Sequence, residues 1–293
     1  MRKEQFLQLC QQAMDRGDAI HGETFEGFSL DGTKLSKINL SGCVFQDIQF
    51  NQVQMNNMTL RSCRFVNCSF EGCNVEQSKL DQAQFVNCNG TMTVFDGCEM
   101  RQAQFNRGRY NIMYCMSCDL QGSEWGGVRI LKGVFQASLF VSVRMDNCEL
   151  EDTRFLRSQI RSGKFSQSMF VDTGFDEVSG QELPNVEFVN CVFSNGVFAS
   201  MDLTGVQFQH CTFHAGQFAG SYLANATFAE SQVNNSNFRA CKFKQTDFRG
   251  VDLTSATFDE SVDTKGMLLD EGQQVGDNGL NAAMHSNNSS MFR

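Results

Sequence analysis

The residues in this sequence that are best suited to metal binding or covalent chemistry are thirteen cysteines and four histidines. Thiolates and imidazoles are ligands that zinc prefers, and two thiols can also form a disulfide. Eleven of the cysteines fall into two series whose members lie five residues, or a multiple of five, apart. Zinc knuckles have shorter, unequal spacings, so the pattern predicts one recurring structural position and no metal centre. The members are Cys43, Cys63, Cys68, Cys73, Cys88, Cys98, Cys118, Cys148, Cys191, Cys211 and Cys241.

The other reactive side chains do not assemble into a recognisable catalytic motif. His210 and His214 are close in sequence but have no third metal ligand beside them, and His21 and His285 are isolated. No glycine-rich segment has the spacing of a phosphate-binding loop, and no serine has a visible base. We therefore predict no enzyme activity, no metal and no cofactor.

These residues sit in a chain with a five-residue period, clearest from Val186 to Phe258. A large apolar residue occupies every fifth position, which we call the central position, and a small residue precedes it by two. This period is neither the 3.6 of a helix nor the 2 of a strand, and it indicates a repeat architecture. Of 28 Phe, 25 lie at central positions. We predict that they form the core, including Phe188, Phe193, Phe208, Phe213 and Phe238.

The repeat resembles that of the pentapeptide-repeat family. Units of this type are Cys-Thr-Phe-His-Ala at 211–215, Ser-Asn-Phe-Arg-Ala at 236–240 and Val-Asp-Leu-Thr-Ser at 251–255. The resemblance implies an all-β fold, a right-handed quadrilateral parallel β-helix in which four units make one coil of about twenty residues. Central side chains would then point inward, and the cysteines would fill small inward sites as reduced thiols, typical of a cytosolic protein.

The repeat frame divides the chain into three parts. Residues 1–22 carry Phe6, Leu9, Cys10 and Ala13 at helical spacing and predict an amphipathic helix that caps the first coil. A helix that docks a partner is the alternative. Residues 23–258 form the β-helix, and its frame shifts by three residues in a loop at 176–187. Residues 259–293 are expected to be a C-terminal cap and a flexible tail.

Two central positions in the first half break the pattern. Gly90 and Cys115 stand where a large apolar residue is expected, so each either leaves a local void or is filled by a neighbour such as Met92 or Met113. Trp125 occupies a central position and is expected in the core. No window of the sequence is apolar and long enough for a membrane span, and no classical export signal opens it. Export by a specialised system stays open.

Charge gives the main indication of binding surfaces. Residues 101–164 hold ten Lys and Arg against six Asp and Glu, although the whole chain has a net charge of −9. Stacking at about twenty-residue intervals places Arg109 beneath Arg129, and Arg144 beneath Lys164, so these four residues are candidates for contact with an acidic partner. Neutralisation by Glu149, Glu151 and Asp152 is the alternative. Glu177 and Glu182, in the loop at 176–187, complete the candidate partner-binding residues.

The family resemblance implies two functions. The segment Phe-Glu-Gly-Phe-Ser-Leu-Asp-Gly-Thr-Lys-Leu, 25–35, is similar to family members associated with type VI secretion, which favours a non-enzymatic scaffold for a protein partner. The alternative is a mimic of duplex DNA that binds and protects or inhibits DNA gyrase or topoisomerase IV. With either function, we expect no direct binding of nucleic acid. The oligomeric state is open, and an end-to-end dimer is compatible with this architecture.

Overall fold

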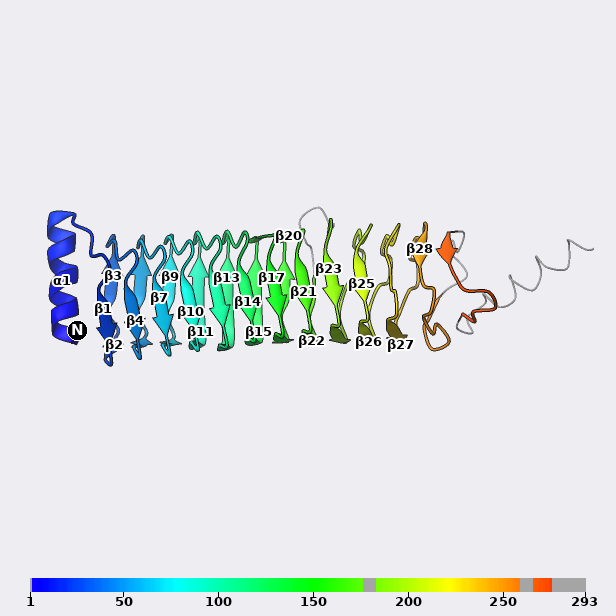
Figure 1. Ribbon diagram of the computed structural model, residues 1–293, viewed down its shortest axis with the longest axis horizontal. Helices are drawn as coiled ribbons and strands as arrows, with labels where there is room; N and C mark the ends of the chain where they lie inside the picture. Colours follow the sequence, from blue (N-terminus) through cyan, green and yellow to red (C-terminus); the bar gives the residue numbers. More distant parts are fainter. Residues whose placement is uncertain (1, 176–182, 259–265, 276–293) are drawn as a thin grey trace, which may run out of the picture. The chain divides into compact units, whose positions relative to one another are not determined.

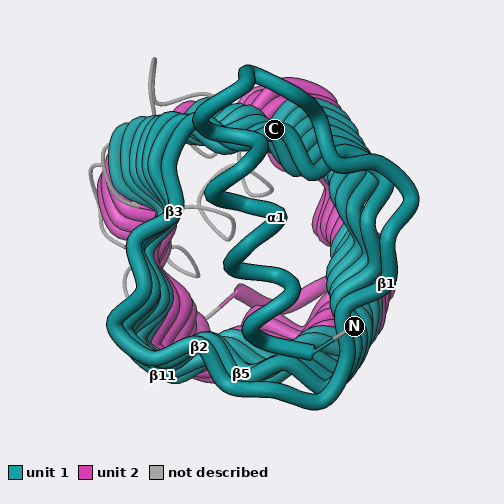
Figure 2. Tube along the Cα trace, turned by 90° about the vertical axis from the view of Figure 1, so that its left-hand side faces the viewer, with its two compact units in different colours: residues 1–159 teal, residues 160–293 magenta. Residues whose placement is uncertain are grey.

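The computed structural model describes residues 2–175, 183–258 and 266–275. The chain divides into two compact units, residues 1–159 (unit 1) and 160–293 (unit 2), which are described separately (Figure 2). Within each unit the chain coils so that residues about twenty positions apart pair in parallel. The right-handed quadrilateral β-helix implied by the repeat is thereby confirmed.

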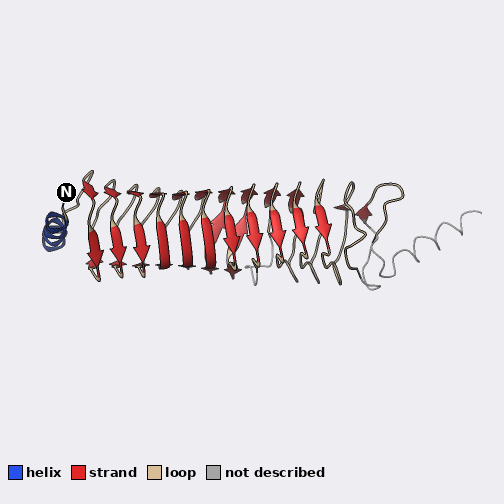
Figure 3. Cartoon of the chain, turned by 90° about the horizontal axis from the view of Figure 1, so that it is seen from below, coloured by secondary structure: helices blue, strands red, loops and turns tan. Residues whose placement is uncertain are grey.

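The first and second walls of unit 1 are parallel ladders of short strands, which follow one another as rungs in Figure 1 and Figure 3. The first wall contains β1 (Thr24–Glu26), β4 (Val44–Gln46), β7 (Arg64–Val66), β10 (Gln84–Val86), β12 (Gln104–Asn106), β14 (Glu124–Gly126) and β17 (Arg144–Asp146). The second wall contains β2 (Ser29–Asp31), β5 (Gln49–Asn51), β8 (Ser69–Glu71), β11 (Asn89–Asp96), β13 (Arg109–Met116), β15 (Arg129–Gln136) and β18 (Glu149–Glu151).

The third wall of unit 1 contains β3 (Lys34–Ser36), β6 (Gln54–Asn56), β9 (Asn74–Glu76) and β19 (Arg154–Leu156), joined by the second halves of β11, β13 and β15. Strands β11, β13 and β15 are each eight residues long and run through the corner between the second and third walls. The fourth wall is held mostly by single bridges, such as Asn39 to Thr59, and contains β16 (Leu139–Val141). The short strand β20 (Gln159–Arg161) lies at the boundary of the units.

Unit 2 repeats the arrangement with a register that shows the frame shift. Its first wall contains β21 (Lys164–Ser166), β23 (Glu187–Val189) and β25 (Gln207–Gln209), and its second contains β22 (Met169–Val171), β24 (Val192–Ser194), β26 (Thr212–His214) and β27 (Gln232–Asn234). Lys164 aligns with Glu187, 23 residues on, whereas Glu187 aligns with Gln207, 20 residues on. Three residues are therefore inserted in this coil. The last pair is β28 (Thr246–Asp247) with β29 (Met267–Leu268).

The five-residue period follows from the geometry of one wall and one corner. The central residue of each strand is buried and its two neighbours face solvent, as strand alternation requires. Two residues after the centre, the chain turns through a left-handed conformation, as at Asn67 (φ 52°) and Asn87 (φ 52°). Asn and Gly tolerate this conformation better than other residues. At the corner the Asn67 N–H still donates to the Val86 carbonyl in the next coil, at 2.9 Å.

The small inward residue is a hydrogen-bond donor as well as a space-filler. The Cys63 thiol donates to the Leu40 carbonyl at 3.0 Å, and the Ser221 hydroxyl donates to the Phe198 carbonyl at 2.6 Å. Donor and acceptor are 23 residues apart in both cases, so each bond ties a coil to the one before it. All thirteen cysteines are buried free thiols. Treating these positions only as compact hydrophobes misses this bond.

Stacked aromatic rings fill the interior. In unit 1, Phe45 and Phe65 stack with ring centroids 4.9 Å apart, and Trp125 stacks on Phe105 at 3.9 Å while its indole N–H donates to Ser123. In unit 2, the ring pairs of adjacent coils stack at 4.8 to 5.4 Å. The following residues are fully buried there: Phe188, Phe193, Phe208, Phe213 and Phe238. Such rings contribute about 1.5–3 kcal/mol each through burial.

Helix α1 (Lys3–Arg16) lies across the mouth of the first coil of unit 1, which confirms the capping helix (Figure 2). Its Phe6 ring meets Phe25 edge-on at 4.7 Å, and Cys10 and Ala13 are buried on the same face. The helix ends at Gly17, whose positive φ of 73° allows its N–H to reach the Ala13 carbonyl. Among the described residues, no helix is long and apolar enough to cross a bilayer.

Candidate recognition groove

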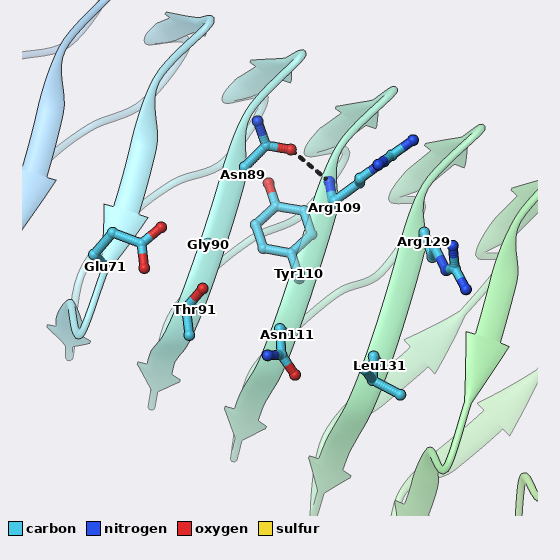
Figure 4. A pocket seen from close by; sticks show the side chains of 9 residues that line it. All are labelled: Glu71, Asn89, Gly90, Thr91, Arg109, Tyr110, Asn111, Arg129 and Leu131. Atoms are coloured by element: carbon cyan, nitrogen blue, oxygen red, sulfur yellow. Dashed lines mark hydrogen bonds between the residues drawn. The ribbon is translucent and has the colours of Figure 1, made fainter.

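A hollow of about 460 Å³ lies on the second wall of unit 1. It is built by β8, β11, β13 and β15, which are neighbours in that ladder (Figure 4). Its lining residues are Glu71, Asn89, Gly90, Thr91, Arg109, Tyr110, Asn111, Arg129 and Leu131. We call this hollow the groove.

Strand alternation explains the shape of the groove. The buried central residues Gly90 and Tyr110 leave their backbone as its floor. The outward residues just before and just after each central residue form the two sides of the groove. One side is formed by Asn89, Arg109 and Arg129, and the other by Glu71, Thr91, Asn111 and Leu131.

A second hollow of about 330 Å³ adjoins the groove at the corner between the first and second walls, and it shares Arg109 and Arg129. Small residues create it, because Gly108 and Gly127 leave space between longer side chains. Gly127 is also the left-handed corner residue of its coil, with φ 62°. Arg107 adds a further cation at its rim. The two hollows together make Arg109 reachable from both sides.

The two aligned arginines differ in their ionic partners. Arg109 and Arg129 are neighbours in the β13–β15 register. The Arg129 guanidinium pairs with Glu149 at 3.2 Å and with Glu151 at 3.7 Å. The backbone N–H of Arg109 donates to the Asn89 side chain at 3.1 Å, but its guanidinium has no ion pair within the described part of the chain. Of the two arginines that line the groove, Arg109 is therefore the one left available for a ligand.

The floor of the groove departs from the repeat because Tyr110 occupies the space of a missing side chain. A Cβ atom on Gly90 would clash with the Thr93 hydroxyl and lie 3.0 Å from Cδ1 of Tyr110, so the hydroxyl and the ring together fill the site that a large residue would take. Tyr110 is 3% exposed, and burial raises the pKa of its hydroxyl well above the usual value. The expectation that Met92 fills this space is wrong, because Met92 is 59% exposed. Met113, beside Cys115, is buried.

The corner beside the groove carries a β-branched residue in the left-handed conformation that recurs at the corners of the coil. Met92, Ile112 and Lys132 have φ of 54°, 60° and 56°. A β-branched residue such as Ile112 is a genuine outlier in the left-handed region, and strain of this kind costs about 1–3 kcal/mol. These corners are the ones through which the long strands β11, β13 and β15 run. The strained Ile112, the three long strands and the glycine at central position 90 therefore all occur at the groove.

The other candidate partner-binding residues lie elsewhere. Arg144 is on β17 of the first wall, in register with Glu124. Lys164 belongs to unit 2 and pairs with Glu187 at 3.2 Å. Glu177 and Glu182 lie outside the described residues. Only Arg109 and Arg129 are thus brought into one site.

Sequence reasoning overlooked Glu71, Asn89, Tyr110 and Leu131 as groove residues. The sequence contains a pattern that could have identified one side of the groove, because positions 71, 91, 111 and 131 form one column at intervals of twenty residues. A charge count selects only the arginines of the opposite column. The uncharged members of both columns become visible only when outward neighbours are stacked coil by coil.

Groups with acid–base or metal chemistry are dispersed. Burial raises the pKa of the Cys63 and Cys10 thiols to about 12, which keeps them protonated and unreactive near neutral pH. His210 is exposed and faces Glu230 at 3.2 Å. Within the described ranges, no group of three or more His, Cys, Asp or Glu could hold a metal ion.

Comparison with protein families gives two matches. The family described as "Pentapeptide repeat region" matches residues 58–130 and 181–258, which is just over half of the chain. The family described as "Pentapeptide repeats (8 copies)" matches residues 29–67. The first match includes every residue that lines the groove except Leu131. No curated protein matches the chain.

Solved structures show a distant likeness. A trypsin-treated variant of QnrB1, a plasmid-mediated fluoroquinolone resistance protein, is 14% identical over 93% of this chain and 98% of that chain, with a TM-score of 0.34. HetL, a pentapeptide repeat protein involved in heterocyst differentiation regulation in Nostoc sp. strain PCC 7120, is 11% identical over 94% and 99%, with a TM-score of 0.23. The A-module of the Azotobacter vinelandii mannuronan C-5 epimerase AlgE6 is 8% identical over 92% and 91%, with a TM-score of 0.31. These values carry no inference about function.

Proposed function

Because the chain belongs to the pentapeptide-repeat family, we propose that it is a non-enzymatic scaffold that binds a protein partner through its outer walls. The observation that carries this proposal is the packing of the interior. Stacked rings such as Phe85 on Phe105, at 4.6 Å, fill the space that a substrate would need. The groove, by contrast, opens on an outer wall and presents fixed side chains.

A photo-crosslinking experiment tests the scaffold proposal. A benzoylphenylalanine residue replaces Thr91 in the groove or, as a matched control, Gln84 on β10 of the first wall. We expect one or a few discrete protein adducts from the groove position in native cells, and the adducted protein should form a stable complex when purified. Absence of any protein complex with the intact chain would contradict the scaffold.

We also propose a finer role, in which the scaffold serves a bacterial secretion apparatus. The similarity of segment 25–35 to secretion-associated family members supports it. Deleting the gene in its host should lower the amount of exported effector in the medium. Wild-type protein should restore export, and unchanged export in the deletion strain would count against this role.

The second candidate is a DNA mimic that binds gyrase or topoisomerase IV. The net charge of −9 favours it. The cations Arg109 and Arg129 oppose it, because they interrupt any acidic face on the second wall of unit 1. A supercoiling assay with purified gyrase separates the two functions. The scaffold predicts no inhibition and no protection from quinolones at micromolar protein, whereas a DNA mimic predicts at least one of these effects.

A further inference from the structure

The groove is the place where several departures from the repeat coincide. Gly90 replaces a large core residue, Tyr110 fills its space, and Ile112 adopts a left-handed conformation at the adjoining corner. The strands of eight residues also occur here. Backbone strain persists where the surrounding structure imposes it, and it is enriched at binding sites. The coincidence marks this part of the wall as specialised.

The charges in the groove run in a fixed order. The Glu71 carboxylate lies at one end and, within the described residues, has no ion pair. Arg109 follows two coils further on, also without an ion pair. The next arginine, Arg129, is already neutralised by Glu149 and Glu151. A ligand therefore meets one available anion and then one available cation.

Apolar side chains lie in and beside the groove. Leu131 lines the groove one coil beyond Arg109 and is partly exposed. Met92, in the neighbouring corner, is the most exposed large apolar side chain among the described residues, at 59%. Ile112 lies in the same corner column, between Met92 and Lys132. An apolar side chain of a ligand would be shielded from water here.

We propose that the groove binds an extended segment of a partner protein that carries a basic residue, an acidic residue and an apolar residue in that order. This inference rests on the scaffold function proposed above. The basic residue pairs with Glu71, the carboxylate pairs with Arg109, and the apolar residue packs on Leu131. Coils stack at about 4.8 Å and an extended chain rises about 3.3 Å per residue. Two coils therefore correspond to about three residues, and the implied pattern is Lys-x-x-Glu-x-Leu.

The same charges favour a protein segment over nucleic acid. A phosphate backbone carries a negative charge at every nucleotide. It would meet Glu71 at one end of the groove and, one coil beyond the other end, Glu149 and Glu151, which share the single positive charge of Arg129. A single carboxylate can reach Arg109 without approaching these acids. The recognition would be mainly electrostatic, so its strength should fall as salt is raised.

Fluorescence anisotropy with a labelled peptide tests the proposal on the full chain. The probe contains Lys-Ser-Ser-Glu-Ser-Leu, and its control has Gln in place of Glu. We expect saturable binding of the first peptide and at least about tenfold weaker binding of the second. The variant Arg109→Glu should lose binding by a similar factor, and a probe with Lys in place of Glu should restore it. This charge-swap rescue separates a direct contact from a folding defect.

The matched control variant is Arg64→Glu, which makes the same change at an exposed position on β7 of the first wall. It should bind the probe like the wild type. No saturable binding of the probe at millimolar peptide, or equal effects of Arg64→Glu and Arg109→Glu, would overturn the proposal. Tighter binding of a 20-nucleotide RNA than of the peptide, dependent on Arg109, would also overturn it.

The outcomes distinguish this inference from the scaffold function. If the intact protein binds a partner equally well with and without Arg109→Glu, the scaffold stands and the groove proposal fails. If the peptide binds but crosslinking captures no protein complex, the groove chemistry stands and the scaffold fails.

Discussion

The interiors of the two units are built differently although they share one repeat. In unit 2, the first wall stacks Phe188, Phe208 and Phe228 with centroids 5.2 and 5.0 Å apart. In unit 1, the second wall passes through Phe70, Gly90 and Tyr110, and the Tyr110 ring and the Thr93 hydroxyl pack into the Gly90 site. Unit 2 keeps a uniform core, whereas unit 1 interrupts its core beneath the groove. The coils of unit 2 show that stacked rings stabilise the interior. The coils around Gly90 show where that stacking is interrupted and the outer wall carries the groove.

The largest expected effect is on the uniform core of unit 2. Phe208→Ala removes a fully buried ring that stacks on Phe188 and Phe228. We expect the free energy of unfolding to fall by about 3–5 kcal/mol, because the column cannot close over the cavity. Urea denaturation followed by circular dichroism measures it. Cys191→Ala is the matched small-site control and should cost much less, so a reversal of this order would contradict the inward and outward assignments.

A smaller loss is expected from making unit 1 as regular as unit 2. Gly90→Leu restores the large central residue, but its Cβ would crowd Tyr110, Thr93 and the Phe70 carbonyl. We expect a cost of about 1–3 kcal/mol from overpacking, measured by the same denaturation.

The double variant Gly90→Leu with Tyr110→Leu gives this comparison a sharper form. Removing the ring relieves the contact with Tyr110 while the contacts with Thr93 and the Phe70 carbonyl remain, so the combined cost should be smaller than the sum of the single costs. Additive costs would show that Tyr110 does not fill the Gly90 site.

Removing an inward hydroxyl should lower the free energy of unfolding by an intermediate amount. Ser221 in unit 2 donates to the Phe198 carbonyl at 2.6 Å and accepts from the Met201 N–H at 3.1 Å. Ser221→Ala leaves that buried N–H without its partner, so we expect a cost of about 1 kcal/mol. Ser221→Cys keeps a donor and should recover part of the loss. Equal stability of Ser221→Ala and wild type would show that the bond between coils contributes nothing.

Substituting a solvent-exposed residue of the outer wall should change the free energy of unfolding least. Arg129 pairs with Glu149, and both side chains are about half exposed, at 53% and 49%. An ion pair this exposed contributes little, so Arg129→Ala should change the free energy of unfolding by about 0.5 kcal/mol or less. A loss comparable to that of Phe208→Ala would mean that the groove arginines are structural.

The architecture could be predicted from the sequence because one period determines burial for whole coils. Central positions such as Phe193 and Phe213 follow from that period alone. The three-residue shift before Glu187 is also visible in the sequence and appears in the register. The helix over the first coil could be inferred from the spacing of Phe6, Cys10 and Ala13.

The groove could be predicted only in part. Arg109 and Arg129 are found by charge and twenty-residue stacking, but the pairing of Arg129 with Glu149 depends on side-chain geometry. Nothing in the period indicates that Tyr110 turns into the space above Gly90 in place of Met92. The corner conformation of Ile112 is equally hidden, because its neighbours in the same column, Met92 and Lys132, are not residues that favour positive φ.

Helix α1 has a further consequence for how copies of this protein can associate. The strands β1, β2 and β3 pair with β4, β5 and β6 on one side, and on the other side they meet a helix. A helix offers no free strand edge, so a second copy finds no template for β-sheet extension at this end. A chain lacking residues 3–16 would expose open edges and the apolar Phe25 ring, so we expect it to associate with other copies through that end.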